Sequence, residues 1–144
     1  MRQGVALFKK ETSANGNSEW VFNGRIKSHD IQITGICFGQ SLDENNNNQL
    51  RLFSIGKDRK CFEYDVKNSK KSGALPVMEC FTIEQEATPT AVIWYPTIDF
   101  QEGLILTCND EYKMKLWNPK LTNSRRTALG PTYGGEISKL KLLN

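Results

Sequence analysis

Two stretches of this chain repeat one short pattern, and this repeat restricts the fold more than any other feature. Residues 50–66 read LRLFSIGKDRKCFEYDV, two runs with alternating apolar residues joined by a Gly-Lys-Asp-Arg turn. Residues 103–118, GLILTCNDEYKMKLWN, follow the same plan. Trp117 closes the second stretch about 53 residues after Tyr64 closes the first. A unit of two strands that recurs at this period predicts a protein built from stacked sheets.

Further strands are expected around these two hairpins, and no amphipathic helix is expected. The apolar patterns predict strands at residues 5–8, 20–26, 33–38, 76–83, 90–95, 125–129 and 137–142. Polar segments between them are interpreted as loops: residues 27–31, which contain His29, the Asn-rich residues 39–49, and the Lys/Ser/Gly-rich residues 67–75. The sequence therefore predicts an all-β protein.

Composition and charge exclude several classes of protein. The chain has 144 residues, of which 38% are hydrophobic and 24% charged, as in a folded domain with its own core. No apolar run reaches the roughly 20 residues of a membrane helix, and no secretory signal is visible, so no membrane partner is expected. A net charge of +3 is low for a protein that binds nucleic acid, so no nucleic-acid partner is expected.

The four cysteines, Cys37, Cys61, Cys80 and Cys108, all lie in apolar strand-like runs and lack C-x-x-C spacing. They are expected to be buried free thiols that act as small hydrophobic groups. No Asn-x-Ser/Thr acceptor occurs either. Both observations predict a reducing intracellular compartment.

Residues 28–65 resemble one repeat of the WD-repeat family. Ser28-His29 stands where that family has Gly-His, Ser54 lies in the second strand, Asp58 lies in the turn, and Tyr64 replaces the Trp of Trp-Asp. The resemblance implies a structural relay in which His29, Ser54, Asp58 and Tyr64 are hydrogen-bonded and satisfy one another inside the sheet.

The second copy of the unit keeps less of this pattern. It retains Trp117, but it has Asn118 in place of Asp, Glu111 at the position of the turn carboxylate, and no His before Thr90. No relay is therefore expected in the second copy, and packing alone is expected to hold it.

The resemblance implies blades of a WD-repeat β-propeller, about two of them complete and four-stranded, with partial blades on either side. Residues 1–27 would give strands of a preceding blade, 28–84 a WD-like blade, 85–130 a second, degenerate blade, and 131–144 the first strand of a following one. Open sheets leave unpaired edges. The incomplete propeller is therefore expected to be completed by more of its own protein, by a second chain or by a host assembly.

A narrower resemblance rests on the strings ITGICFG, LRLFSIGKDRKCFEYDV, TPTAVIWYP, NDEYKMKLWN and RRTALGPTYGGEI. Together they are similar to the late blades of a WD-repeat family of the ciliary axoneme, whose members belong to the calmodulin- and spoke-associated complex at the base of radial spokes. This resemblance implies a cytoskeletal scaffold in the cytoplasm and cilium, with other axonemal and radial spoke proteins as partners and a contribution to motility. The alternative is a generic intracellular WD-repeat adaptor unrelated to cilia.

The resemblance also indicates where partners would bind. In a WD blade, the loops between strands two and three and between strands four and one lie on one face, and binding residues are often found on loops. The expected partner-facing residues are Lys57, Arg59, Lys60, Glu111, Tyr112 and Lys113. The opposite face would carry the Asn-rich and Lys-rich loops. Lys67, Lys70 and Lys71 are interpreted there as solvated charges, with a contact for an acidic partner as the alternative.

Two other constellations were weighed. His29, Ser54 and Asp58 are the residue types of a hydrolase triad, but no G-x-S-x-G motif is present and the spacing fits the relay. No catalytic residue is therefore assigned, and a hydrolase that uses His29 remains a minor alternative. The loop after residue 42 begins like an EF-hand, but it has Asn48 at the sixth position and Ser54 at the twelfth, so no metal or cofactor is expected.

Overall fold

We describe the protein from a computed structural model that covers residues 2–42, 45, 47–97, 100–118, 123–129 and 136–143; for 96–97, 100–102 and 123–129 it describes the backbone only. These residues form strands and no helix, and none could therefore span a membrane as a helix. The strands are β1 (Gln3–Thr12), β2 (Ser18–His29), β3 (Ile33–Leu42), β4 (Asn48–Gly56), β5 (Lys60–Tyr64), β6 (Val77–Thr82), β7 (Pro89–Thr97), β8 (Phe100–Asn109), β9 (Lys113–Asn118) and β10 (Asn123–Leu129).

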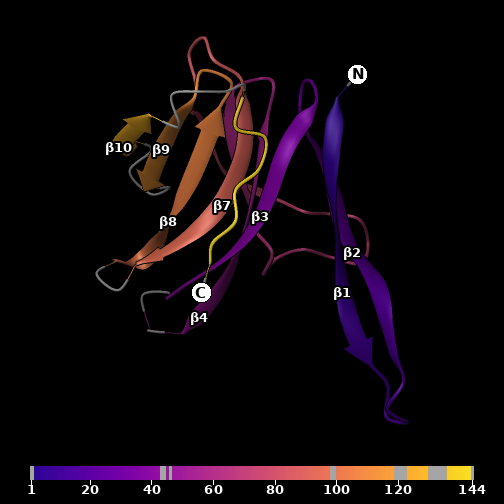
Figure 1. Cartoon of the computed structure of the whole chain (residues 1–144). Coiled ribbons are helices and arrows are strands. Elements are labelled where there is room, and N and C mark those ends of the chain that lie inside the picture. The colour runs from indigo at the N-terminus through magenta and orange to yellow at the C-terminus, as the bar shows by residue number, and fades with distance from the viewer. Residues whose placement is uncertain are drawn as a thin grey trace.

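The strands form three antiparallel sheets (Figure 1). β1 and β2 form a two-stranded hairpin, β3-β4-β5-β6 form the middle sheet, and β7-β8-β9-β10 form the C-terminal sheet. Each strand pairs with its neighbour in sequence, so both four-stranded sheets are simple meanders. The prediction of an all-β, antiparallel protein is confirmed for the described residues.

One face of the middle sheet packs against the C-terminal sheet. Phe53 and Ile55 on β4 lie opposite Glu63 and Cys61 on β5, so their side chains leave the sheet on the same side. Phe53, Ile55 and Cys61 are fully buried. They form a core cluster with residues of the C-terminal sheet, namely Val92, Ile105 and Trp117. Burial of this apolar surface is what holds the two sheets face to face.

The other face of the middle sheet packs against the hairpin. Leu52 on β4 lies opposite Tyr64 on β5, and both are 1% exposed. Val5 and Leu7 of β1 cover them and complete a second core cluster. The middle sheet is therefore buried on both sides, which explains why both faces of β4 are apolar in the sequence.

Trp94 on β7 lies at the centre of the contact between the two larger sheets. Its ring stacks on Phe53 with centroids 5.9 Å apart. A Cβ placed on Gly39 or Gly103 would come within 2.2 or 1.9 Å of this ring, so only glycine leaves it room. The guanidinium of Arg51 lies 4.9 Å from the Phe53 ring.

Arg51 also makes an ion pair inside the middle sheet. Its Nε and Nη2 donate to the two carboxylate oxygens of Glu63 at 2.6 and 2.8 Å. Both side chains are almost completely buried. This paired geometry satisfies two charges that would otherwise be costly in the core.

The far end of the hairpin extends away from the rest of the molecule (Figure 1). Trp20 is 70% exposed there, and Phe8 is 52% exposed and meets Phe22 edge-to-face with centroids 5.7 Å apart. The strand predicted at residues 20–26 therefore begins with a Trp20 that faces solvent and does not contribute to the core. Only the part of the hairpin around Val5 and Leu7 has a sheet to pack on.

Several predicted boundaries differ from the structure. β2 continues through His29 into the segment interpreted as a connection. The expected loop at 39–49 is shorter, because β3 runs on to Leu42 and β4 begins at Asn48. The predicted strand at 137–142 is absent: residues 136–143 are extended but not paired as a strand, and Thr90 Oγ1 donates to the Ile137 carbonyl.

The cysteines are all free, as predicted, but they are not all buried. Cys61 and Cys108 are buried, and Cys37 is partly buried. Burial raises the pKa of Cys37 to about 12 and that of Cys108 to about 11. Cys80 is exposed, because β6 is the outermost strand of the middle sheet and most of its side chains face solvent.

Candidate functional site

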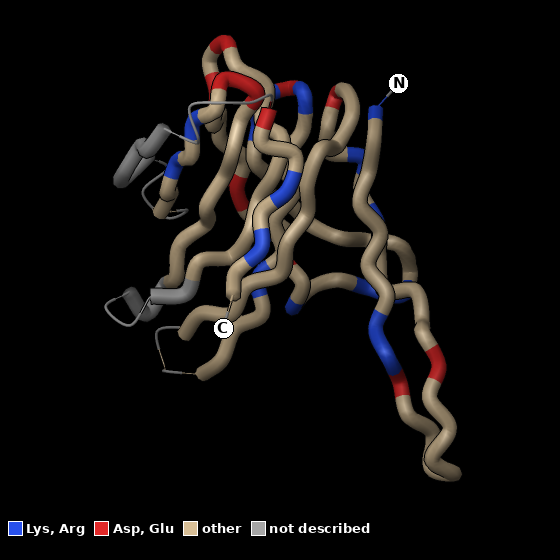
Figure 2. Tube along the Cα trace, in the orientation of Figure 1, with Lys and Arg blue, Asp and Glu red and all other residues tan. Residues whose placement is uncertain are grey.

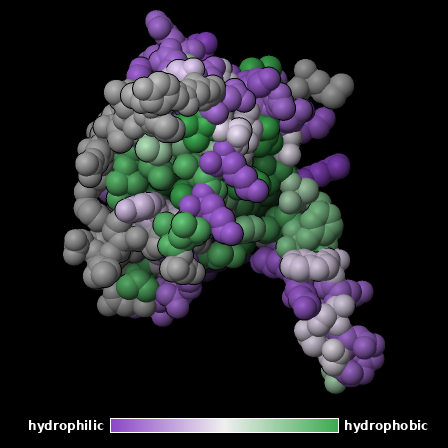
Figure 3. All heavy atoms as spheres, in the orientation of Figure 1, coloured by the Kyte–Doolittle hydropathy of each residue, from purple (hydrophilic) through white to green (hydrophobic). Residues whose placement is uncertain are grey.

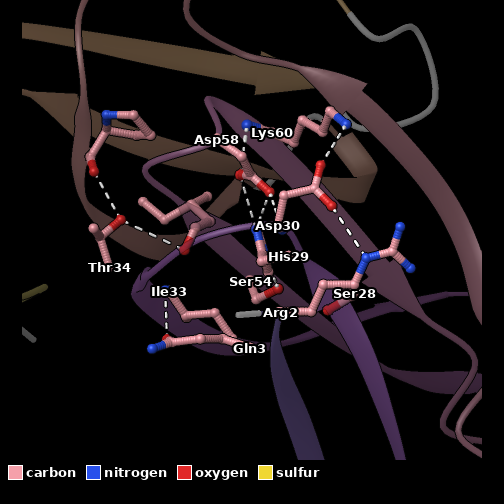
Figure 4. A network of polar contacts seen from close by, with 12 residues as sticks. Arg2, Gln3, Ser28, His29, Asp30, Ile33, Thr34, Ser54, Asp58 and Lys60 are labelled. Carbon is pink, nitrogen blue, oxygen red and sulfur yellow. Dashed lines mark hydrogen bonds and ion pairs between the residues drawn. The ribbon is translucent and has the colours of Figure 1, made fainter.

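A buried polar chain joins the end of β2 to β4 and β5 (Figure 4). His29 has no exposed surface. Its Nε2 lies 2.7 Å from Ser54 Oγ, which in turn lies 2.6 Å from the Tyr64 hydroxyl. Its Nδ1 lies 2.9 and 3.0 Å from the two carboxylate oxygens of Asp58. The structure thus brings together the four residues expected to form the relay, and Ser28 Oγ extends it at 2.6 Å from the Tyr64 hydroxyl.

The turn between β4 and β5 presents Asp58 to the histidine. Arg59 adopts a left-handed conformation there, with φ of 65°. The carboxylate of Asp58 accepts from the backbone N–H of Asp30 at 3.1 Å and from that of Lys60 at 3.3 Å. Gly56 is required beside it, because a Cβ would lie 2.6 Å from His29 Nδ1. The carboxylate therefore ties the β2–β3 connection to the β4–β5 turn.

The centre of this chain is closed to solvent. Ser54 is fully buried, and its hydroxyl already contacts both His29 and Tyr64. The His29 ring also meets Phe62 edge-to-face, with centroids 4.7 Å apart. Burial raises the pKa of Tyr64, and its hydrogen bonds with Ser28 and Ser54 partly oppose that rise. Nothing in this arrangement leaves the serine hydroxyl open to a substrate.

The C-terminal sheet contains a second, different polar network at the matching place. Glu84, which follows β6, is 4% exposed. Its carboxylate accepts from Asn109 Nδ2 at 2.9 Å and from Lys115 Nζ at 2.7 Å. Trp117 Nε1 donates to Thr107 Oγ1 at 2.9 Å, in the same strand positions as Tyr64 and Ser54. The expectation that packing alone holds this sheet was therefore wrong.

The β8–β9 turn has the same backbone shape as the β4–β5 turn, but its carboxylate comes from a different position. Tyr112 is left-handed, with φ of 64°, as Arg59 is in the first turn. Asn109 Oδ1 accepts from the backbone N–H groups of Glu111 and Lys113, each at 3.0 Å. Asp110, one residue before the expected Glu111, accepts from the backbone N–H of Thr88 at 2.8 Å.

Glu111 instead points to solvent and pairs with Lys113. The two charged groups are 2.9 Å apart, and both side chains are at least 40% exposed. This hydrogen bond raises the pKa of Lys113. Glu111 therefore contributes to the surface and not to the buried network.

The connection between the two larger sheets links both turns. Ile83 N donates to the Arg59 carbonyl at 2.9 Å, and Arg59 Nη1 donates to the Gln85 carbonyl at 2.7 Å. At the other end of the connection, Asp110 N donates to the Thr88 carbonyl at 3.0 Å. The two turns consequently lie at the same end of the stacked sheets.

The six residues expected to face partners all belong to these turns. Lys57, Arg59, Glu111 and Tyr112 are exposed, while Lys60 and Lys113 are partly exposed. Within the described part of the chain, no group of three or more His, Cys, Asp and Glu could hold a metal ion. Residues 131–135, part of the segment expected to begin a following blade, lie outside the described residues.

Sequence reasoning missed Glu84 and Asn109 because the WD-repeat pattern has a histidine, and not a glutamate, before the first strand of the blade. One signal was available: Asn109 stands two residues after Thr107, as Gly56 does after Ser54. Because Asn109 stands where the first copy has Gly56, the buried side chain beside it is expected to differ from His29 as well.

The geometry defines a class: an all-β protein of stacked antiparallel meanders tied at one end by buried polar networks. One solved structure supports this fold, the "Structure of ctPRC2 in complex with H3K27me3 and H3K27M". A chain in it matches 73% of this chain and 21% of its own length, with a TM-score of 0.54 and 13% identity. No protein-family model matches the sequence.

Particular homologues are identified by sequence. All carry the name cilia- and flagella-associated protein 251. The protein of Tetrahymena thermophila is 42% identical over 141 residues, and that of Mus musculus is 39% identical over 129 residues. These matches cover 88% and 90% of this chain, but the chain spans only 14% and 10% of the relatives. The homologues are therefore proteins of cilia and flagella, of which this chain matches a small part.

Proposed function

We propose that this chain is a non-catalytic scaffold, made of WD-repeat β-propeller blades, that binds other proteins of the ciliary or flagellar axoneme. Its place would be the base of the radial spokes, where it would contribute to motility. The observation that carries the proposal is the buried chain from Asp58 through His29 and Ser54 to Tyr64. These hydrogen bonds join side chains of this chain to one another, as expected of a polar network that stabilises the fold.

The sheets support the assignment of blades. The two four-stranded meanders repeat the same turn, with left-handed residues at Arg59 and Tyr112. Two further observations support a partial blade at the N-terminal side. Ile36, Phe38 and Leu50 are each more than half exposed on the face that the hairpin covers elsewhere. Among the described residues, β1 pairs with β2 alone.

The two turns are the best candidate for the docking face. They offer Lys57, Arg59, Tyr112 and Lys113 to solvent on a rigid base of paired strands. The aromatic ring of Tyr112 is 40% exposed, which is the kind of group that anchors protein interfaces. The name of the homologues supports a partner within the cilium.

Affinity capture from axonemes tests this proposal. The triple variant Lys57→Ala, Arg59→Ala, Lys113→Ala should retain its melting temperature but capture much less axonemal protein. Because Arg59 also bonds to the Gln85 carbonyl, the double variant Lys57→Ala, Lys113→Ala serves as a milder version. Matched changes of Lys27 and Lys139, which lie outside both turns, are the control. Unchanged capture by the triple variant would contradict this docking face. Capture from a whole-cell extract but not from axonemes would favour the generic adaptor.

The hydrolase alternative receives no support from the geometry, because Ser54 is fully buried and bonded on both sides. The scaffold proposal predicts that His29→Ala lowers stability, whereas a hydrolase would lose activity and keep its stability. A thermal melt of this one variant separates the two.

A further inference from the structure

A groove lies between the hairpin and the middle sheet, at the end of β4 opposite to the relay turn. Its volume is about 500 Å³, and its walls include Lys9 of β1 and Lys67 of the loop after β5. Figure 3 shows the hairpin standing apart from the body of the molecule, which leaves this side open. The groove shares no residue with the two polar networks, so it is a separate surface.

The lining combines three kinds of group that an extended peptide needs. Leu50 is 52% exposed and lies near Val66, and together they give an apolar floor. Asn48 and Gln49, at the start of β4, add side-chain amides that donate to or accept from a peptide backbone. The exposed ammonium groups of Lys9 and Lys67 provide positive charge on two sides.

Further positive charge surrounds the groove. Figure 2 shows basic residues on β1 and in the loop beside it, with acidic residues toward the far end of the hairpin. That loop is fixed to the hairpin, since Arg25 N donates to the Gly73 carbonyl at 3.1 Å and Asn23 Nδ2 donates to Ser69 Oγ. Glu11 is paired with Lys71 at 2.6 Å, and none of the described residues that line the groove is acidic. Asp43 and Glu44, which precede β4 in the sequence, lie outside the described part of the chain.

We propose that this groove binds an extended acidic peptide segment of a partner protein. Glutamate or aspartate side chains would pair with Lys9 and Lys67, while the peptide backbone would use the amides of Asn48 and Gln49. Exposed charges of this kind act mainly through the association rate and the choice of partner. Binding is therefore expected to be weak and to decrease with salt.

A peptide fits this surface better than a nucleic acid does. Its described lining residues include two lysines and no aromatic ring on which a base could stack. Its amides and its aliphatic floor instead match the backbone and side chains of a peptide. The proposal goes beyond the axonemal role, since it concerns the chemistry of the segment and the opposite end of the sheets.

Fluorescence anisotropy tests the proposal on the full chain. The probe is a labelled peptide of alternating Glu and Gly, and the matched neutral probe alternates Gln and Gly. The acidic probe should bind at low salt and be released at high salt, while the neutral probe should not bind. The variant Lys9→Glu, Lys67→Glu should weaken binding about tenfold. The control Lys27→Glu, at the other end of the hairpin and outside both turns, should bind as the unchanged protein does.

Three results would overturn the proposal. They are equal binding of the two peptides, an effect of Lys27→Glu as large as that of the groove variant, and tighter binding of a labelled single-stranded oligonucleotide than of the acidic peptide. A second variant, Lys9→Gln with Lys67→Gln, removes the charge without reversing it and separates loss of binding from loss of folding. This measurement needs no axonemal extract, so its failure would leave the proposed docking at the turns untouched.

Discussion

In the middle and C-terminal sheets, different buried side chains hydrogen-bond to the corresponding turn. Each has a tight turn with one left-handed residue, and each brings a buried polar group from the segment before its first strand against that turn. In the middle sheet this group is the ring of His29, and in the C-terminal sheet it is the carboxylate of Glu84. The backbone geometry is thus kept while the buried side chains are exchanged.

The exchange works because every buried polar atom in each network has a partner. A histidine ring can bridge a hydroxyl and a carboxylate through its two nitrogens, as it does between Ser54 and Asp58. A carboxylate cannot donate, so Glu84 needs donors, and Asn109 and Lys115 supply them. The requirement is therefore complete hydrogen bonding, and the identity of the residues follows from it.

Removing the carboxylate of the second network should have the largest effect. Glu84→Ala leaves the Lys115 ammonium, which is only 20% exposed, and the buried Asn109 amide without their acceptor. The expected loss of unfolding free energy is about 3 kcal/mol, measured by urea denaturation. The control is Glu111→Ala, which removes an exposed carboxylate from the β8–β9 turn and should leave the urea midpoint unchanged. A similar midpoint for both variants would show that the second network is not the counterpart of the first.

Breaking the first network should cost somewhat less. His29→Ala removes the common partner of Ser54 and Asp58, with an expected loss of about 2 kcal/mol. The loss is smaller than for Glu84 because Ser54 keeps its contact with Tyr64, and Asp58 keeps its backbone donors. Thermal melts of His29→Ala beside Asp30→Ala, an exposed neighbour, check this. If His29→Ala were the more damaging of the two network variants, the proposed order would be wrong.

Alkaline pH should act on the middle sheet through Tyr64, because Trp117, its counterpart, cannot ionise. Burial raises the pKa of Tyr64 above its ordinary value of 10.0. The stabilisation is therefore complete below about pH 10 and is lost at higher pH, since the unfolded chain releases the proton that folded Tyr64 retains. Tyr64→Phe should cost about 1 kcal/mol at neutral pH.

The measurement is the melting temperature between pH 8 and pH 11 for both proteins. The unchanged protein should lose stability above pH 10 more steeply than Tyr64→Phe does. Buried cysteines contribute equally to both curves, so the difference belongs to Tyr64. Parallel curves would show that Tyr64 ionises freely in the folded protein.

The smallest effect concerns thiol reactivity. Cys80 lies on the exposed outer strand of the middle sheet, whereas Cys61 and Cys108 are buried. A thiol reagent at neutral pH should modify Cys80 first and leave those two unmodified until the protein unfolds. Mass spectrometry after brief labelling identifies the site, and Cys80→Ser is the control. Early labelling of Cys61 would indicate that the stacked sheets separate readily.

Sequence reasoning predicted the parts of this fold that follow a local rule. The alternation at residues 50–66 and 103–118 predicted both central hairpins. The resemblance to a WD repeat implied the set His29, Ser54, Asp58 and Tyr64, which the structure brings together. Glu84 was missed because its role depends on Asn109 and Lys115, which lie far from it in sequence. The strand expected at 137–142 has the right pattern but no pairing partner among the described residues.

The exposed position of Trp20 could not be predicted either. Its strand contains the apolar run Trp20-Val21-Phe22, but little of the Trp20 side chain is covered by the described residues. Apolar residues in a strand indicate a face that can be buried. Whether a side chain on that face is exposed depends on which other segments pack against it.

The burial of the middle sheet on both faces has a consequence for how the molecule opens. The middle sheet shares one interface with the hairpin and another with the C-terminal sheet, whereas the hairpin has only one interface. In a linear array of nearest-neighbour contacts, a terminal unit can detach while the others stay folded, but a central unit cannot. Hydrogen exchange should therefore begin in the hairpin, and β4 and β5 should be the last amides to exchange.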